Sequence, residues 1–177
     1  MSSQQIQQAL EARFGNDKYL VPNCYFFSWE SDFLVVKQSG YIYEIEIKIS
    51  RSDFFADFNK VFKHRALVTG IETSKTGVPY SDIDTHKAHV DLTSEAFYLT
   101  EHKRLRPNKF FYACPQGLLR SEEIPNYAGL MYLSDLGTMD IIKPAPWLHR
   151  DKIEVEKRLC NKFYRYWKSA NYENKKL

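Results

Sequence analysis

The segment YEIEIKISRSDFFADF (43–58) changes from a strand pattern to a helix pattern within a few residues, and this change constrains the fold more than any other feature. Its first half alternates isoleucines with charged residues, so Glu46 and Lys48 share one face of a strand. Ser50 then suits the N-cap of a single helix, with the acidic Asp53 three positions later. One face of this helix is expected to carry Phe54, Phe55, Phe58, Val61 and Phe62, and its solvated side is expected to carry Asp53, Asp57, Lys60 and His64. A strand that runs directly into a helix is typical of an α/β domain.

The patterns on either side of this segment extend the sheet. SDFLVVKQSG (31–40) predicts a neighbouring strand that ends in a glycine turn, and KYLVPNCYFF (18–27) predicts another strand before it. Apolar residues at four-residue intervals predict a helix over 4–14. Later strands are expected in KFFYACP, EEIPNYAGLMYLSD and TMDIIKPAP. The 177 residues therefore predict one α/β domain, 1–177, with a central mixed sheet flanked by helices.

Two segments depart from this regular pattern. Residues 66–108 show no sustained period beyond a short helix expected near 94–103, and an insertion of this length is expected to form a flap, a loop or an unrecognised element. Residues 148–177 predict a basic amphipathic helix whose aromatic side chains dock on the core. Because lysines and arginines alternate with those aromatics, a tail that faces nucleic acid is the alternative.

Composition limits the possible classes of protein. The net charge of +3 is too small to identify a nucleic-acid-binding protein by itself. No apolar run is long enough to cross a bilayer, and the first residues lack the basic and apolar regions of a signal peptide. The three cysteines have no metal-type spacing, which indicates reduced thiols. We therefore expect a soluble, cytoplasmic protein with no membrane partner.

Two acidic residues and a lysine in the neighbouring strands form a candidate site. Asp32 begins one strand and Glu46 lies near the end of the next, so pairing through a turn at Gly40 would bring them together at one end of the hairpin, beside Lys48. Two carboxylates suit Mg²⁺, and a lysine can orient water or stabilise charge on a phosphate. This combination predicts metal-assisted hydrolysis of a phosphodiester.

Asp32 followed by Glu46-Ile47-Lys48 resembles the D…(D/E)xK signature of the PD-(D/E)xK, or restriction-endonuclease-like, nuclease superfamily, and in particular its phage and bacterial members. The stretch from ESDFLVV to FNKVFKH carries most of the resemblance, which covers residues 1–65 and 106–147. The resemblance implies a restriction-endonuclease-like core and an enzyme that hydrolyses DNA with Mg²⁺ or Mn²⁺.

The resemblance also implies a role for each matching residue. Asp32 and Glu46 would bind the metal together with the backbone carbonyl of Ile47, and Lys48 would orient the attacking water. Glu11 matches an additional acid that many members contribute from the first helix. The helix after the motif would contribute three contacts to DNA phosphates: Lys60, Lys63 and His64. Many nucleases dimerise to cut both strands, so the resemblance leaves room for a homodimer, although no sequence pattern identifies an interface.

Several observations leave alternatives open. Ser31 stands where the family name has a proline, and Glu30 and Glu44 compete with Asp32 and Glu46 for the metal-binding roles. The same fold also suits a non-catalytic DNA-binding or assembly module, in which these charges form structural ion pairs. A phosphodiesterase that acts on nucleotides or RNA is a third hypothesis.

A second cluster of possible metal ligands lies in SDIDTHKAHVD (81–91), where His86 and His89 have a spacing known from zinc sites. No helical pattern places the two histidines on one face, and no cysteine lies nearby. A polar loop is therefore the preferred interpretation of this segment.

Overall fold

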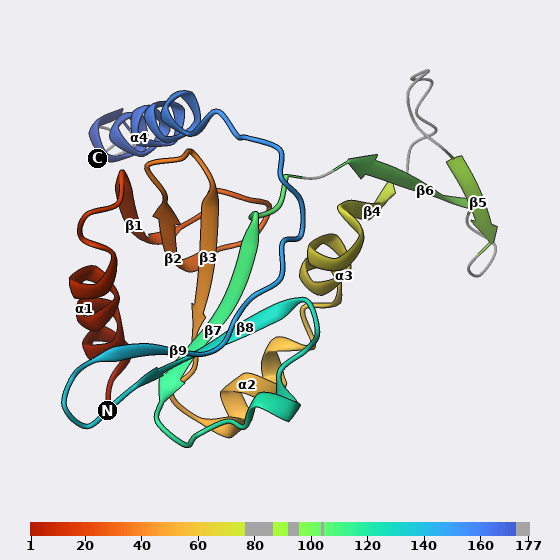
Figure 1. The fold of residues 1–177 in the computed structure, drawn as a ribbon. Coiled ribbons are helices and arrows are strands. Elements are labelled where there is room, and N and C mark those ends of the chain that lie inside the picture. Colours follow the sequence, from red (N-terminus) through yellow and green to blue (C-terminus); the bar gives the residue numbers. More distant parts are fainter. Residues whose placement is uncertain (77–86, 92–95, 104, 173–177) are drawn as a thin grey trace.

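The computed structural model describes residues 1–76, 87–91, 96–103 and 105–172, and between 71 and 103 it describes the backbone alone. At the centre lies a mixed sheet of six strands in the order β1-β2-β3-β7-β8-β9 (Figure 1). The strands are β1 (Tyr19–Cys24), β2 (Ser31–Val36), β3 (Ile42–Ile47), β7 (Lys109–Pro115), β8 (Ala128–Leu133) and β9 (Met139–Lys143). The pairs β3–β7 and β7–β8 are parallel, and the remaining neighbours are antiparallel. The predicted α/β class with a mixed sheet is confirmed.

Helices cover both faces of this sheet (Figure 1). The helix α1 (Ser3–Phe14) buries Ile6 and Leu10 against one face, where they join Ile45 and Ile47 of β3 in a hydrophobic core. Successive strand residues point to opposite faces, so Glu44, Glu46 and Lys48 face the other side. That side is covered by α2 (Arg51–Asp57), α3 (Val61–Thr69) and the start of α4 (Val155–Tyr172).

The hairpin of β2 and β3 has the register that the sequence indicated. Its pairing begins with Val36 opposite Ile42 and continues to Phe33 opposite Ile45. Gly40 occupies the turn with a φ of +83°, a conformation that favours glycine. The hairpin therefore carries the start of β2 and the end of β3 to the same edge of the molecule.

The segment after the hairpin forms two helices, whereas the sequence predicted one. Ser50 caps α2 as expected, because its hydroxyl accepts a hydrogen bond from the Asp53 N–H at 3.1 Å. The chain then turns between α2 and α3, and Phe54 is buried while Phe55 and Phe62 are exposed. The expectation of a single phenylalanine face is therefore wrong. The turn instead directs several charged side chains of α2 and α3 toward β3.

The predicted insertion contains a small antiparallel sheet in the order β4-β6-β5, which extends away from the six-stranded sheet (Figure 1). Its strands are β4 (Ile71–Thr76), β5 (Lys87–Asp91) and β6 (Ala96–Lys103). The short helix expected near 94–103 is therefore wrong. Pairing of β6 with both neighbouring strands supplies the backbone hydrogen bonds, and this long-range pairing leaves little local signal. Residues 77–86, which include His86, lie outside the described part, as does the side chain of His89.

The C-terminal helix packs differently from the prediction. Val155 and Leu159 of α4 join a cluster with Leu34 and Ile42, so the first turns of the helix contact the sheet. The aromatic side chains farther along are exposed: Phe163, Tyr164, Tyr166 and Trp167. The expectation that these aromatics dock on the core is wrong. No helix in the described part of the chain is both long and apolar enough to cross a membrane.

Candidate active site

Asp32, Glu46 and Lys48 lie together at one end of the β2–β3 hairpin. One carboxylate oxygen of Asp32, Oδ2, accepts a hydrogen bond from the backbone N–H of Ile47 at 2.8 Å. This bond holds the Asp32 carboxylate against the segment that links Glu46 to Lys48. The Lys48 N–H in turn donates to the Ala113 carbonyl at 2.9 Å, which extends the pairing of β3 with β7 past the end of the strand. The proximity inferred from the sequence is therefore present in the fold.

The carboxylate of Glu46 is buried and surrounded by lysines. Only 2% of its side chain is exposed. Lys63 Nζ lies 2.6 Å from Oε2, and Oε1 lies 3.1 Å from Lys48 Nζ and 3.2 Å from Lys60 Nζ. Lys48 and Lys63 are also buried, whereas about half of the Lys60 side chain is exposed. Both oxygens of Glu46 are thus compensated by positive charge, as a buried carboxylate requires.

Asp57, at the end of α2, adds a second buried carboxylate to this cluster. Lys60 Nζ and Lys48 Nζ lie 2.9 Å and 3.5 Å from its Oδ1. Tyr112 of β7 donates its hydroxyl to Oδ2 at 3.1 Å, and His64 Nε2 lies 3.3 Å from the same oxygen. Burial by itself would raise the pKa of Asp57. The hydrogen bond with His64 and the positive charges of the surrounding lysines outweigh burial and hold that pKa well below its ordinary value. Asp57 therefore stays ionised.

Asp32 has the opposite electrostatic environment. Burial, reinforced by the negative charge of nearby Glu46, raises the pKa of Asp32 to about 6, although the Ile47 N–H and the lysine charges act against this. Three carboxylates therefore share this region with three ammonium groups: Asp32, Glu46 and Asp57 with Lys48, Lys60 and Lys63. The ionised form of Asp32 is thus less stabilised than that of Asp57, so Asp32 gains more from an added cation than Asp57 does.

Glu44 lies on the same face of β3 but in a separate environment. Its Oε1 accepts hydrogen bonds from the indole N–H of Trp29 at 2.7 Å and from the Ser31 hydroxyl at 3.0 Å. Its buried Oε2 has no hydrogen-bond partner among the described residues. Burial raises the pKa of Glu44 to about 7. Glu30, the other competing acid, is exposed ahead of β2.

The remaining predicted residues differ in their positions. Glu11 is exposed on α1, and α1 packs on the opposite face of the sheet, so the fold does not bring Glu11 to the carboxylate pair. Lys63 is buried against Glu46 rather than presented to solvent. His64 lies between Asp57 and Tyr127, whose hydroxyl is 2.7 Å from Nδ1. Only Lys60 of the three predicted phosphate contacts combines substantial exposure with a place in the cluster.

Sequence reasoning missed two members of the site. Asp57 was expected on a solvated helix face, and Tyr112 belongs to a strand that reads as uniformly apolar. Asp57 is one of two acids in α2, and no local pattern distinguished it from the exposed Asp53. Tyr112 had none, because its partner lies 55 residues away in the chain.

Asp32 and Glu46 are the residues that could hold one hard divalent cation. They offer carboxylate oxygens, which Mg²⁺ prefers, and the Ile47 carbonyl belongs to the same segment. Among the described residues, no three or more His, Cys, Asp or Glu side chains are placed to hold a metal ion together. Mg²⁺ commonly needs only one or two protein carboxylates, since water and substrate phosphates supply its other ligands. A cation here must compete with the lysines for Glu46.

Comparison with known proteins identifies a similar fold. No family model matches the chain, and no curated protein matches it. A solved structure, the SPO1766 protein of unknown function from Silicibacter pomeroyi, superimposes with a TM-score of 0.52 at 15% identity. The match covers 96% of this chain and 90% of that one. At this identity the similarity concerns the fold alone.

Proposed function

We propose that this protein is a metal-dependent nuclease that hydrolyses DNA phosphodiester bonds on a restriction-endonuclease-like core. The observation that carries the proposal is the 2.8 Å hydrogen bond from the Ile47 N–H to Asp32, because it joins the first acid of the motif to the Glu46–Lys48 segment. The order of the elements supports it: a helix, three antiparallel strands, two short helices, and a strand parallel to β3.

Asp32 and Glu46 would hold Mg²⁺ or Mn²⁺ with the Ile47 carbonyl. The bound cation would supply Lewis-acid stabilisation of the phosphate and lower the pKa of water. Lys60 is the most exposed of the three lysines, so it is the one that can turn from Glu46 and Asp57 toward solvent when a cation binds. Lys48 and Lys63 would remain to compensate the buried carboxylates.

Lys48 would act as a charged donor and not as a general base. Burial acts to lower the pKa of Lys48, but the charges of Glu46 and Asp57 outweigh it and hold that pKa above its ordinary value. Its ammonium therefore keeps its proton at neutral pH. In that state Lys48 Nζ donates hydrogen bonds to an attacking water or to a phosphate oxygen and offsets developing negative charge.

A second candidate is a non-catalytic DNA-binding or assembly module. It is favoured by the saturation of Glu46, whose two oxygens are already paired with three lysines of the same chain. In this case the cluster is a structural ion-pair network, and bound metal is not required for function.

The two candidates differ in metal binding and in cleavage. We would titrate the protein with Mn²⁺ by calorimetry and follow Mg²⁺-dependent cleavage of labelled DNA, single-stranded, double-stranded and branched, with RNA in parallel. Asp32→Asn is the sharpest variant, because the amide oxygen can still accept from the Ile47 N–H while the charge is lost. Glu11→Gln is its matched control, because it neutralises an exposed acid on α1, which packs on the opposite face of the sheet.

The nuclease assignment requires that Asp32→Asn lose both Mn²⁺ uptake and cleavage while Glu11→Gln keeps both. If metal uptake and cleavage are unchanged in Asp32→Asn, Asp32 is not a ligand and the proposed metal site is wrong. DNA binding without metal uptake or cleavage in the wild type would favour the module instead. Cleavage of RNA but not DNA would reassign the substrate.

A further inference from the structure

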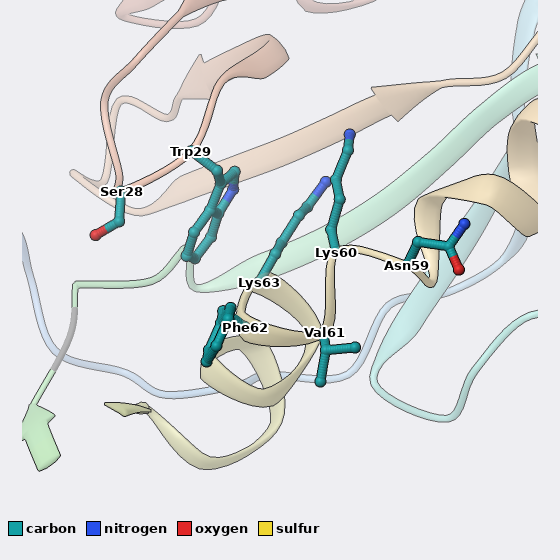
Figure 2. A pocket seen from close by; sticks show the side chains of 7 residues that line it. All are labelled: Ser28, Trp29, Asn59, Lys60, Val61, Phe62 and Lys63. Atoms are coloured by element: carbon teal, nitrogen blue, oxygen red, sulfur yellow. The ribbon is translucent and has the colours of Figure 1, made fainter. Parts of the chain in front are cut away.

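A pocket of about 230 Å³ lies directly beside the carboxylate cluster. It is formed by the loop before β2 and the start of α3, and its walls include Trp29, Lys60, Val61, Phe62 and Lys63 (Figure 2). The ammonium groups of Lys60 and Lys63 both contact Glu46. Two lysines of the pocket wall thus also contact Glu46, the proposed metal ligand.

The walls of the pocket are mostly apolar although two lysines belong to them. In Figure 2 the Lys60 and Lys63 side chains extend in the same direction, away from Phe62 and Val61. Since their charged ends are directed to Glu46, the aliphatic parts remain to line the pocket. Phe62 and Val61 add apolar surface and are more than half exposed. An exposed phenylalanine and valine beside a pocket are available for contact with a ligand.

Trp29 is held in a fixed orientation at this pocket. Its indole N–H donates to buried Glu44 at 2.7 Å, and its ring stacks on Phe27 with centroids 5.4 Å apart and planes at 28°. The orientation of the ring is thus set before any ligand arrives. A rigid aromatic side chain loses little conformational entropy when a second ring packs against it.

These features define the chemistry of the occupant. The pocket suits a flat, largely apolar ring, and its charged end suits a phosphate attached to that ring near the cation site. A nucleotide has both parts. We propose that the pocket binds the base of an unpaired nucleotide whose phosphate lies at Asp32 and Glu46. This inference rests on the proposed nuclease function and specifies its substrate as DNA that is single-stranded or locally unpaired.

The restriction to unpaired DNA follows from geometry. A base within a duplex is stacked and paired, and it reaches a side pocket only after it is rotated out of the helix, which costs a few kcal/mol. A base in a single strand has no such cost. Stacking on aromatic side chains is also tolerant of sequence, because every base has a π-face. The site is therefore expected to select DNA structure more strongly than DNA sequence.

The test uses Phe62→Ala in the 177-residue chain, with Phe55→Ala as the matched control. Phe55 is an aromatic on α2 that is exposed to a similar extent and is not part of the pocket, so both variants should fold. We would measure binding of a short single strand that contains 2-aminopurine, in EDTA, by the fluorescence of that base. The same strand in a duplex, and a strand with one abasic position, would be compared. Cleavage of each would then be followed with Mg²⁺.

We expect quenched 2-aminopurine fluorescence in the wild type and a loss of single-strand affinity of roughly tenfold in Phe62→Ala, the size of one base–aromatic contact. Phe55→Ala should bind as the wild type does. The abasic strand should be bound more weakly by the wild type, with a smaller further loss in Phe62→Ala. The duplex should be bound and cut less well than the single strand.

The outcomes separate this inference from the function on which it rests. If the wild type cuts duplex and single strand equally and Phe62→Ala has no effect, the pocket proposal is wrong and the nuclease assignment stands. If single strands bind through Phe62 but no DNA is cut, the pocket proposal stands and the nuclease assignment is wrong. If the wild type neither binds nor cuts DNA, both are wrong.

Discussion

Lys63 Nζ lies 2.6 Å from Glu46 Oε2, and only 2% of either side chain is exposed. This buried ion pair fixes α3 against β3 and places Lys63 at the motif. Two buried charges are stable in this arrangement only while both are present, because removal of one leaves the other uncompensated. The pair is thus a structural requirement of the site, whatever its chemistry.

The first prediction concerns this pair. Lys63→Met should lower the free energy of unfolding by about 3 kcal/mol, since Glu46 loses its closest buried partner. Lys60→Met is the matched control: it removes a lysine from both Glu46 and Asp57, but that side chain is half exposed, so water screens its charge and a smaller loss of about 1 kcal/mol is expected. Urea denaturation measures both. Equal losses in the two variants would contradict the assigned difference in burial.

The second prediction concerns the pH dependence of stability through Glu44. Its pKa is about 7 in the fold, against 4.5 for a glutamate exposed to water, so the folded protein binds the proton more tightly than the unfolded chain. The stabilisation is complete below about pH 4.5 and is lost as the pH rises toward about 7, by an amount on the order of 3 kcal/mol.

Glu44→Gln should remove this decline, and stability should then fall less between about pH 4.5 and about pH 7 than in the wild type. The glutamine carbonyl can still accept from Trp29 and Ser31. Unfolding free energies measured by urea across this range check the slope, with exposed Glu11→Gln as the control. Parallel curves for Glu44→Gln and wild type would refute the assignment.

The third prediction concerns metal binding and pH. Protons compete with a cation for Asp32, whose pKa burial and the charge of Glu46 raise to about 6. Affinity for Mn²⁺ should therefore increase as the pH rises through about 6, and should level off once Asp32 is ionised. Calorimetric titrations at several pH values measure this. Affinity that does not change across that range would exclude Asp32 as a ligand.

The fourth prediction separates catalysis from metal binding at Lys48. Lys48→Ala should lower the rate of cleavage by about 10²- to 10³-fold, the usual loss when one charged or hydrogen-bonding stabiliser of the transition state is removed. Mn²⁺ affinity should stay the same or rise, because a competitor for Glu46 is gone. Lys48→Arg should recover part of the rate, and exposed Lys152→Ala should behave as the wild type. Full activity in Lys48→Ala would remove this residue from the chemistry.

The sequence by itself determined the hairpin and the place where Asp32, Glu46 and Lys48 meet. This was predictable because the information is local: the alternation of side chains fixes the face, and the turn at Gly40 fixes the register. The α/β class and the later strands followed from the same kind of pattern. The central strands of the mixed sheet are therefore predictable from short segments of sequence.

Tertiary structure alone decided what surrounds those residues. Glu46 meets Lys63 across 17 residues, and Asp57 meets Tyr112 across 55, contacts that no local period records. The same limit explains the errors. Packing of α1 on the opposite face of the sheet removed Glu11 from the site. The buried carboxylate of Glu46 holds Lys63 of α3 in the interior, although the sequence indicated a solvated helix face. Burial of charge depends on which elements pack together, and only the folded chain fixes that.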